Sequence, residues 1–250
     1  MNGGEVPINQ KLIIAHRGAP SDVRENTIQS FERAIALGAD MIEFDVRRTK
    51  DKVLIVYHDE AVQGRPVKEL TFEAIRRIAG SEGFDIPTVE EVLRFTRGKI
   101  KLDVELKEEG YEKEMVELIS RYFERDRFVI TSFNDASLKT IKEDYPGIQA
   151  GLILGKSKTS VWTRISEFFP TKRCNKAKAN FMVPHWKLLR FGFLARAERN
   201  KKPVFVWTVN EEEMILKLLH DRRVYAIVTD KVDFAVSLRK KINSTEEQTV

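Results

Sequence analysis

The amino-acid sequence predicts an α/β fold built on a mainly parallel sheet. Apolar, β-branched runs recur along the chain, and segments with a helical spacing of apolar residues separate most of them, which is typical of βα units. The length of 250 residues suits either one α/β barrel or two small domains. Because no repeat, low-complexity tract or interdomain linker is present, we predict one domain over residues 1–242 and a disordered polar tail over 243–250.

Nine apolar runs are the predicted strands, one more than the eight of a (β/α)8 barrel. They cover residues 12–15, 41–46, 53–57, 100–106, 128–132, 149–154, 181–183, 204–209 and 226–229. Among the helices between them, the first carries Ile28, Phe31 and Ile35 on one stripe and ends where Gly38 offers a C-terminal cap. Thr88 is the predicted N-cap of a later helix, whose first turn is acidic.

The surplus strand has a local explanation. Only the short segment "RRTKDK" separates runs 41–46 and 53–57, which leaves no room for a crossover helix, so we predict an antiparallel hairpin over about residues 41–58. A turn centred near Lys50 and Asp51 would place Glu43 opposite His58 and Asp45 opposite Val56. A shift of one residue would remove this pairing.

The composition indicates a folded globular protein and argues against a disordered or a membrane-spanning one. Hydrophobic residues make up 42% of the chain and charged residues 32%, which is typical of a folded globular protein. No apolar window is long enough for a membrane span, and the first residues do not resemble a signal peptide, so a cytoplasmic protein is expected. The single cysteine, Cys174, cannot form an internal disulfide and is predicted to be a loop residue without function.

The net charge of +5 is modest, and its excess lies between Lys156 and Arg199. Such a region could face nucleic acid, an anionic lipid surface or a phosphorylated substrate, although a solvated basic face is the commoner case. Charge alone therefore selects no partner.

Carboxylates gather on two of the predicted strands. Glu43 and Asp45 alternate with apolar residues in "MIEFDV", and Asp103 and Glu105 do the same in "KLDVELK". Two acids on one face of a buried strand repel each other, so they need a cation or a shared proton. Lys or Arg partners from neighbouring strands, or a surface position for the second strand, remain alternatives. Three or four converging carboxylates would match the oxygen preference of Mg²⁺ or Ca²⁺, whereas no spaced His or Cys pair points to zinc.

The segment "AHRG" follows the first predicted strand, at the barrel edge where enzymes of this architecture build their sites. Arg17 can clamp a phosphate or a carboxylate, and Gly18 permits close approach of the backbone. His16 and His58 titrate near neutrality and both follow strands, which together favours acid–base cleavage of a phosphate ester. Asn26 begins the first helix, where a capping role is slightly favoured over orientation of a ligand.

These residues carry a family resemblance. The stretch from Ala15 to Asp59, with HRG, ENT, ExD, a TKD-type turn and HD, resembles the signature of the glycerophosphodiester phosphodiesterase family. "LDVELK", "VFVWTVN" and "AIVTDKVDF" resemble later motifs of that family, so the match covers nearly the whole chain.

The resemblance implies a TIM-type barrel that uses one divalent metal ion, Mg²⁺ or Ca²⁺, to hydrolyse glycerophosphodiesters to sn-glycerol 3-phosphate and an alcohol. Matching motif positions imply roles for eight residues: Glu43, Asp45 and Glu105 as metal ligands, His16 and His58 as the acid–base pair, Arg17 and Lys107 against the phosphate, and Trp207 as an apolar wall for the glycerol carbons. Without the family, Trp207 would be assigned to the core. The nucleophile is either water or a glycerol hydroxyl that first forms a cyclic phosphate.

Two departures from the family pattern bear on the substrate. The segment after the HD motif, residues 60–93, is short and lacks the "LxRTT" stretch, and Val232 stands where the family commonly has proline. The first departure leaves the head-group preference open. A lysophospholipase D-like activity, with region 156–199 against an acyl chain or a bilayer surface, is the second hypothesis. A non-catalytic phosphate- or nucleic-acid-binding module is the third, although the carboxylates argue against it; the oligomeric state is left open.

Overall fold

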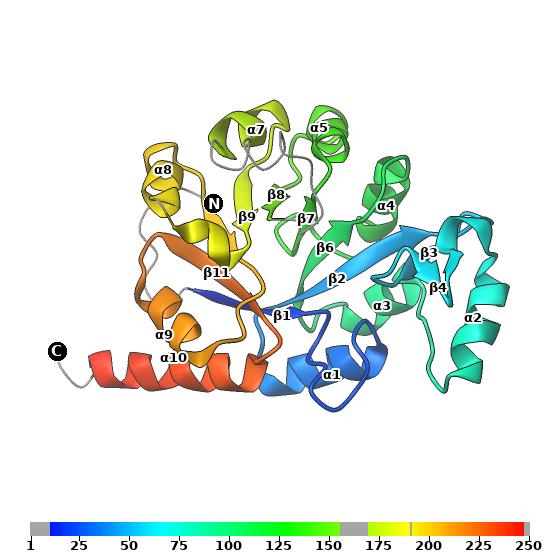
Figure 1. Cartoon of the computed structure of the whole chain (residues 1–250), viewed down its shortest axis with the longest axis horizontal. Coiled ribbons are helices and arrows are strands. Elements are labelled where there is room, and N and C mark those ends of the chain that lie inside the picture. The colour runs from blue at the N-terminus through cyan, green and yellow to red at the C-terminus, as the bar shows by residue number, and fades with distance from the viewer. Residues whose placement is uncertain (1–10, 156–169, 191, 248–250) are drawn as a thin grey trace.

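The computed structural model describes residues 11–155, 170–190 and 192–247, and it confirms the predicted barrel (Figure 1). Eight parallel strands pair in the order β1-β11-β10-β9-β8-β7-β6-β2, and β1 also pairs with β2, which closes the sheet. The barrel strands are β1 Leu12–His16, β2 Met41–Arg48, β6 Lys101–Leu106, β7 Phe128–Ser132, β8 Ala150–Leu154, β9 Phe181–Pro184, β10 Val204–Val206 and β11 Val224–Thr229. Residues 156–169 and Phe191, part of the predicted basic region, lie outside the described residues.

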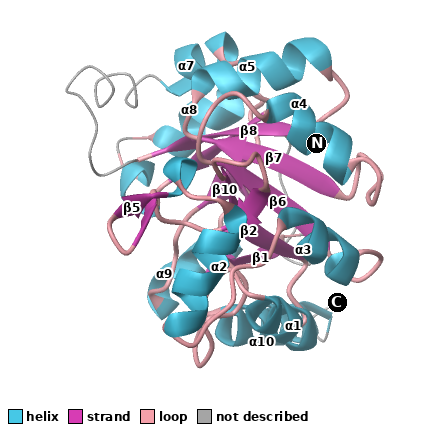
Figure 2. Cartoon of the chain, turned by 90° about the vertical axis from the view of Figure 1, so that its right-hand side faces the viewer, coloured by secondary structure: helices cyan, strands magenta, loops and turns pink. Residues whose placement is uncertain are grey.

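Helices surround the barrel, as Figure 2 shows. The α-helices are α1 Ile28–Leu37, α2 Phe72–Ser81, α3 Val89–Thr96, α4 Glu112–Ile119, α5 Asp135–Asp144, α7 Pro170–Lys176, α8 Phe193–Arg199, α9 Glu212–His220 and α10 Val232–Glu247, and the short 3-10 helices are η2 Val67–Glu69 and η3 Trp186–Leu189. Both predicted caps are confirmed: Gly38 ends α1 with a φ of 82°, and the Thr88 side chain accepts a hydrogen bond from the Glu91 amide at the start of α3. None of the described helices has the length and hydropathy that a membrane span requires.

The alternation of side chains on β2 divides the apolar core into two parts. Ile42, Phe44 and Val46 point outward and pack with the helices in the larger apolar cluster. The inward side is different: Met41 joins a smaller apolar cluster inside the barrel, and Glu43 and Asp45 follow it toward the carboxyl end of the strand. The barrel interior is therefore apolar at one end and charged at the other.

Aromatic rings fill the apolar end of the barrel. The rings of Phe181 and Phe205 stack with centroids 4.4 Å apart, and Phe205 stacks on Tyr225 at 5.7 Å. Gly151 on β8 makes room for this stack, because a Cβ atom there would collide with the ring of Phe181. Stacked rings therefore pack this end of the barrel, and the charged side chains lie toward the opposite end.

The predicted hairpin forms, but its register is shifted by one residue. Strand β3, Leu54–Val56, pairs antiparallel with β2 such that Val46 lies opposite Val56. The prediction assumed a two-residue turn, whereas Thr49 pairs with Val53 around a three-residue loop in which Lys52 has a φ of 64°. The predicted pairs Glu43 with His58 and Asp45 with Val56 are therefore wrong.

Two further local predictions need correction. Cys174 is not a loop residue: it is buried in α7, where burial raises the pKa of its thiol to about 11. Helix α10 continues through Glu247, so residues 243–247 are helical rather than part of a disordered tail.

The segment after the HD motif folds into a small addition beside β3. It contains a two-stranded hairpin that the sequence analysis missed, β4 Ala61–Val62 with β5 Arg65–Pro66, followed by η2 and α2. Its apolar residues form a separate cluster around Ile55, Val67 and Ile75. The addition thus has its own small core, which is anchored on the barrel through β3.

Candidate active site

Three carboxylates converge at the charged end of the barrel. Asp45 lies beside Glu105 in the parallel register of β2 and β6, and Glu43 lies on the same face of β2, two residues before Asp45. One oxygen from each of the three carboxylates lies within 4.8 Å of the others, and all three residues are buried. Burial, together with the neighbouring acids, raises the pKa of Glu43 well above its usual value, and burial also raises the pKa of Glu105. Burial and the mutual repulsion of the acids therefore disfavour the charged forms of Glu43 and Glu105.

Two cations face the carboxylates. Lys107 Nζ donates to Asp45 Oδ1 at 2.9 Å and to Glu105 Oε1 at 2.6 Å, and Arg17 Nε lies 3.1 Å from Asp45 Oδ2. Burial alone would raise the pKa of Asp45, but Lys107 and Arg17 lower it well below the usual value. Asp45 is therefore held as a carboxylate between two cations.

The carboxylate oxygens fit a hard divalent cation. Glu43 Oε1 is buried and has no hydrogen-bond partner within the described ranges, although Glu43 Oε2 accepts a bond from the Arg17 amide at 2.9 Å. A buried, unpaired carboxylate oxygen beside two further carboxylates is the environment that oxygen-preferring ions such as Mg²⁺ and Ca²⁺ occupy. The cluster Glu43, Asp45 and Glu105 could therefore hold a metal ion.

The turn after β1 depends on Gly18. Arg17 and Gly18 both have positive φ angles, 54° and 88°, and the Ser30 hydroxyl of α1 donates to the Arg17 carbonyl at 3.0 Å. A Cβ atom on Gly18 would lie 2.7 Å from the carbonyl carbon of Ser30. The glycine thus lets the turn approach the helix closely enough to direct Arg17 toward Asp45.

We expect Gly18→Ala to destabilise the fold by more than the roughly 1–2 kcal/mol that a left-handed backbone costs a residue with a Cβ atom, because the methyl group also meets Ser30. Urea denaturation measures the change in the free energy of unfolding. Gly64→Ala is the matched control, since Gly64 has a φ of 74° and nothing within 4 Å of its Cβ position. Equal losses in the two variants would contradict the role of the close approach.

Asn26 does not cap the first helix, contrary to the favoured prediction. Thr27 is the N-cap residue, and its side chain accepts a bond from the Ser30 amide. Asn26 is buried, and its Nδ2 donates to Asp45 Oδ2 at 2.8 Å. The helix start therefore places an amide against the central carboxylate of the cluster.

His16 is oriented by a residue that the sequence analysis did not single out. Its Nδ1 lies 2.7 Å from Asp230 Oδ1, and Asp230 in turn accepts a hydrogen bond from Asn210. Burial would raise the pKa of Asp230, but the contact with His16 lowers it overall, so the group is a carboxylate that only accepts. The ring therefore carries its hydrogen on Nδ1, which leaves Nε2 available for proton transfer. "TDKVDF" contains Asp230, but only the fold places it beside His16.

We expect Asp230→Asn to lower kcat by about 10–100-fold, because a hydrogen bond to a charged group contributes about 1.5–3 kcal/mol. Steady-state kinetics would measure the loss, and Asp233→Asn on α10 is a control that leaves the His16 contact intact. An unchanged kcat in Asp230→Asn would show that His16 needs no orienting partner.

His58 lies in the segment that follows β3. Its Nδ1 lies 2.8 Å from Asp59 Oδ1. Burial lowers the pKa of His58 below its ordinary value of 6.5, despite the nearby Asp45 carboxylate, which acts in the opposite direction. The ring is therefore mainly neutral at pH 7 and can accept a proton.

An aromatic wall follows strands β9 and β10 at the same end of the barrel. Trp207 is half-buried, its Nε1 donates to the Leu154 carbonyl at 3.1 Å, and its ring meets Phe133 and His185 edge-on at 5.5 and 5.3 Å. Part of the Trp207 ring packs against the inner apolar cluster and the rest is exposed. Trp207 therefore belongs partly to the inner core, and its role as a wall for the glycerol carbons stays a prediction.

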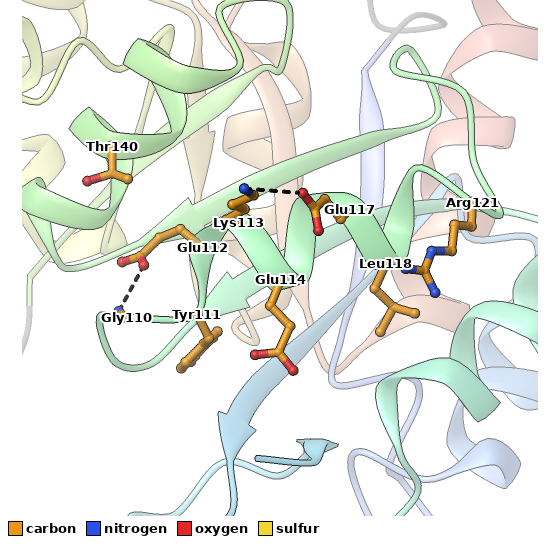
Figure 3. Close-up of a pocket in the computed structure, with 9 residues that line it drawn as sticks. All are labelled: Gly110, Tyr111, Glu112, Lys113, Glu114, Glu117, Leu118, Arg121 and Thr140. Atoms are coloured by element: carbon orange, nitrogen blue, oxygen red, sulfur yellow. Dashed lines mark hydrogen bonds and ion pairs between the residues drawn. The ribbon is translucent and has the colours of Figure 1, made fainter.

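A separate groove of about 540 Å³ lies along α4, on the outside of the barrel (Figure 3). Several of its charged residues have local partners: Glu112 accepts a bond from the Gly110 amide, and Lys113 pairs with Glu117. The carboxylate cluster and both histidines are absent from its lining, so the groove is distinct from the candidate site.

Comparison with known proteins decides the family. The model of the glycerophosphoryl diester phosphodiesterase family matches residues 16–234, a span that contains every site residue described above. The chain belongs to this family. Membership makes the chain a phosphoric diester hydrolase, and it confirms the resemblance found in the sequence.

Relatives and solved structures agree with this membership. The chain is 34% identical to YhdW of Bacillus subtilis, a glycerophosphodiester phosphodiesterase by name, over 92% of the chain and 99% of that protein. It is 31% identical to a glycerophosphodiester phosphodiesterase of Caldanaerobacter subterraneus, over 92% of the chain and 98% of the relative. A phosphodiesterase structure from Oleispira antarctica, in complex with the product sn-glycerol-3-phosphate, has the same fold, with a TM-score of 0.76, 22% identity, and 94% and 97% coverage.

Proposed function

We propose that the chain hydrolyses glycerophosphodiesters to sn-glycerol 3-phosphate and an alcohol, with a divalent metal ion at the carboxylate cluster. The observation that carries the proposal is the convergence of Glu43, Asp45 and Glu105 at the barrel end that also bears His16 and His58, inside the span matched by the family. The names of the relatives and the product in the Oleispira antarctica structure support the same substrate class.

Glu43, Asp45 and Glu105 would hold the metal ion, because they supply the only carboxylate cluster of this kind among the described residues. A bound divalent cation would supply positive charge that polarises a phosphoryl oxygen. Arg17 and Lys107 flank the same carboxylates and would neutralise the remaining phosphate charge. The half-exposed ring of Trp207 would pack against the glycerol carbons.

The two histidines would divide the proton transfers. His58, whose pKa burial lowers, would accept the proton of the attacking hydroxyl. His16 would act in its doubly protonated form, with Nδ1–H held by Asp230, and would give its Nε2 proton to the leaving alkoxide. In the net reaction, water adds a P–O bond and the P–O bond to the alcohol breaks. The proton that the nucleophile loses is balanced by the proton that the alkoxide gains.

The test is a substrate panel assayed for release of the free alcohol, with glycerol 3-phosphate as the second product of the diesters and lysophosphatidic acid as the second product of the lysolipid. Glycerophosphocholine, glycerophosphoethanolamine and a lysophosphatidylcholine are each incubated with the protein after chelation, and then with Mg²⁺ or Ca²⁺ restored separately. We expect release from the water-soluble diesters that stops with chelator and returns with one of the ions. Turnover of the lysolipid alone would replace the proposal with a lysophospholipase D-like activity. No metal-dependent release from any substrate would reject both.

A further inference from the structure

Arg47 lies at the rim of the barrel, on the same face of β2 as Glu43 and Asp45. It continues the alternation of the charged face toward the carboxyl end of the strand, one residue beyond Val46, whose carbonyl accepts a bond from the amide of Lys107, the residue that directly follows β6. Only 8% of Arg47 is exposed, so its guanidinium group requires partners. No role in the proposed reaction has been assigned to it above.

The guanidinium group contacts two loops. Nε and Nη2 both donate to the backbone carbonyl of His58, at 2.9 and 2.7 Å. Nη1 donates to the carboxylate of Glu108. All three guanidinium nitrogens therefore donate hydrogen bonds within the protein, and two of them donate to the carbonyl oxygen of His58.

Each of the two loops carries a residue of the candidate site. His58 lies in the segment after β3, where the described structure has no helix or strand until Ala61. Glu108 directly follows Lys107, in the loop after β6. Tyr111 fixes that second loop to β2, because its hydroxyl accepts from the Lys107 amide at 3.1 Å and donates to the Val46 carbonyl at 2.6 Å. The segment of His58 is attached to β2 in two places: the Tyr57 amide donates to the Asp45 carbonyl at 3.0 Å, and Arg47 donates to the carbonyl of His58 itself.

We propose that Arg47 is a positioning residue for His58: its forked contact with the His58 carbonyl sets the location of the imidazole relative to the carboxylates and Lys107. This inference rests on the proposed function, since it assigns the contact a consequence for turnover. Arginine is needed because its planar fork directs two N–H groups at one oxygen, whereas the ammonium of lysine is a point charge on a flexible stem.

The next residue on β2 offers a matched control. Arg48 points to the opposite side of the strand, where Nη1 donates to the Gly110 carbonyl at 2.9 Å and lies 3.6 Å from Glu114 Oε2. Gly110 and Glu114 line the outer groove of Figure 3. Arg48 thus also joins a carbonyl and a carboxylate, and its guanidinium lies 5.6 Å from the centre of the Tyr111 ring. Within the described part of the chain, these contacts include none of the carboxylate cluster, Arg17, Lys107 or the two histidines.

The experiment compares Arg47→Lys and Arg48→Lys, each in the wild-type and in the His58→Ala background. We expect Arg47→Lys to lower kcat on the order of 10–100-fold with little change in KM, as a displaced catalytic group does, and Arg48→Lys to leave kcat unchanged. In the His58→Ala background, Arg47→Lys should cause no further loss, because a residue that acts only through His58 has nothing left to position. An equal loss in both backgrounds, or a rise in KM alone, would overturn the inference.

A measurement independent of turnover separates this inference from the proposed function. The NMR resonances of the His58 ring, assigned by their absence in His58→Ala, should shift in Arg47→Lys and stay in place in Arg48→Lys. Unchanged resonances in Arg47→Lys would overturn the positioning role even if activity falls. A shift in a protein that hydrolyses no glycerophosphodiester would support the contact and reject the proposed function.

Discussion

His58→Ala and His16→Ala are each expected to lower kcat by about 10²–10⁴-fold, which is the usual contribution of a positioned acid or base. His58 should be the base, because burial lowers the pKa of its ring below 6.5 and thereby favours the neutral form. The acid limb of the kcat/KM profile of the wild-type protein should accordingly fall below pH 6.5, since the neutral ring persists to lower pH. This limb should be absent in His58→Ala.

The control for both histidine variants is His220→Ala. His220 ends α9 on the surface, where its Nδ1 lies 2.9 Å from the Leu216 carbonyl, and it contacts none of the carboxylates. Circular dichroism should show intact secondary structure in all three variants. A wild-type rate in either His16→Ala or His58→Ala, with metal dependence retained, would remove that histidine from the proposed mechanism.

Glu43→Gln should lower activity by more than about 100-fold, beyond the loss that even outer-shell partners of a metal ion cause. The substitution keeps the shape of the side chain and removes the charge that the buried Oε1 atom would offer to a cation. Calorimetric titration with Mg²⁺ and with Ca²⁺ should show binding to the wild-type protein and greatly weakened binding to the variant. Activity alone could fall for other reasons, so the binding measurement is the decisive one.

Although Glu43→Gln should lower activity, it should not lower the stability of the metal-free protein. Because burial raises the pKa of Glu43, its carboxylate opposes folding at pH 7 when no cation compensates it, and a neutral glutamine avoids this cost. We expect metal-free Glu43→Gln to unfold at an equal or higher urea concentration than the metal-free wild type. Asp103→Asn is the matched control: it lies beside Glu43 in the register, its pKa is raised to about 7 by burial, and it is outside the three-carboxylate cluster. Equal metal affinity in Glu43→Gln and wild type would reject this metal site.

The barrel could be predicted from the sequence because its signals are local. Each strand is a short apolar run, and the charged face of "MIEFDV" is visible as an alternation with period two. Hairpin register could not be predicted in the same way, since it depends on whether Lys52 adopts a left-handed conformation, which no apolar pattern encodes.

The site residues could be predicted from the sequence more easily than the residues that contact them. Asp230 lies 214 positions from His16 along the chain, and only closure of the barrel between β1 and β11 brings the two together. Asn26 could be placed at the start of α1, but its bond to Asp45 follows from the turn geometry at Arg17 and Gly18. Long-range contacts of this kind depend on topology, and a single sequence does not display them.

The separate apolar cluster beside β3 gives the small addition a core of its own, which is smaller than the core of the barrel and should be less stable. His58 lies between β3 and the small hairpin of this addition, and Arg47 joins its carbonyl to β2, while the carboxylates lie on the barrel strands themselves. On warming, activity should therefore be lost before the barrel unfolds, because the small addition can unfold locally and displace the His58 ring. The highest temperature at which the enzyme is active would then depend on local unfolding of the segment that carries His58, and not on the unfolding temperature of the barrel.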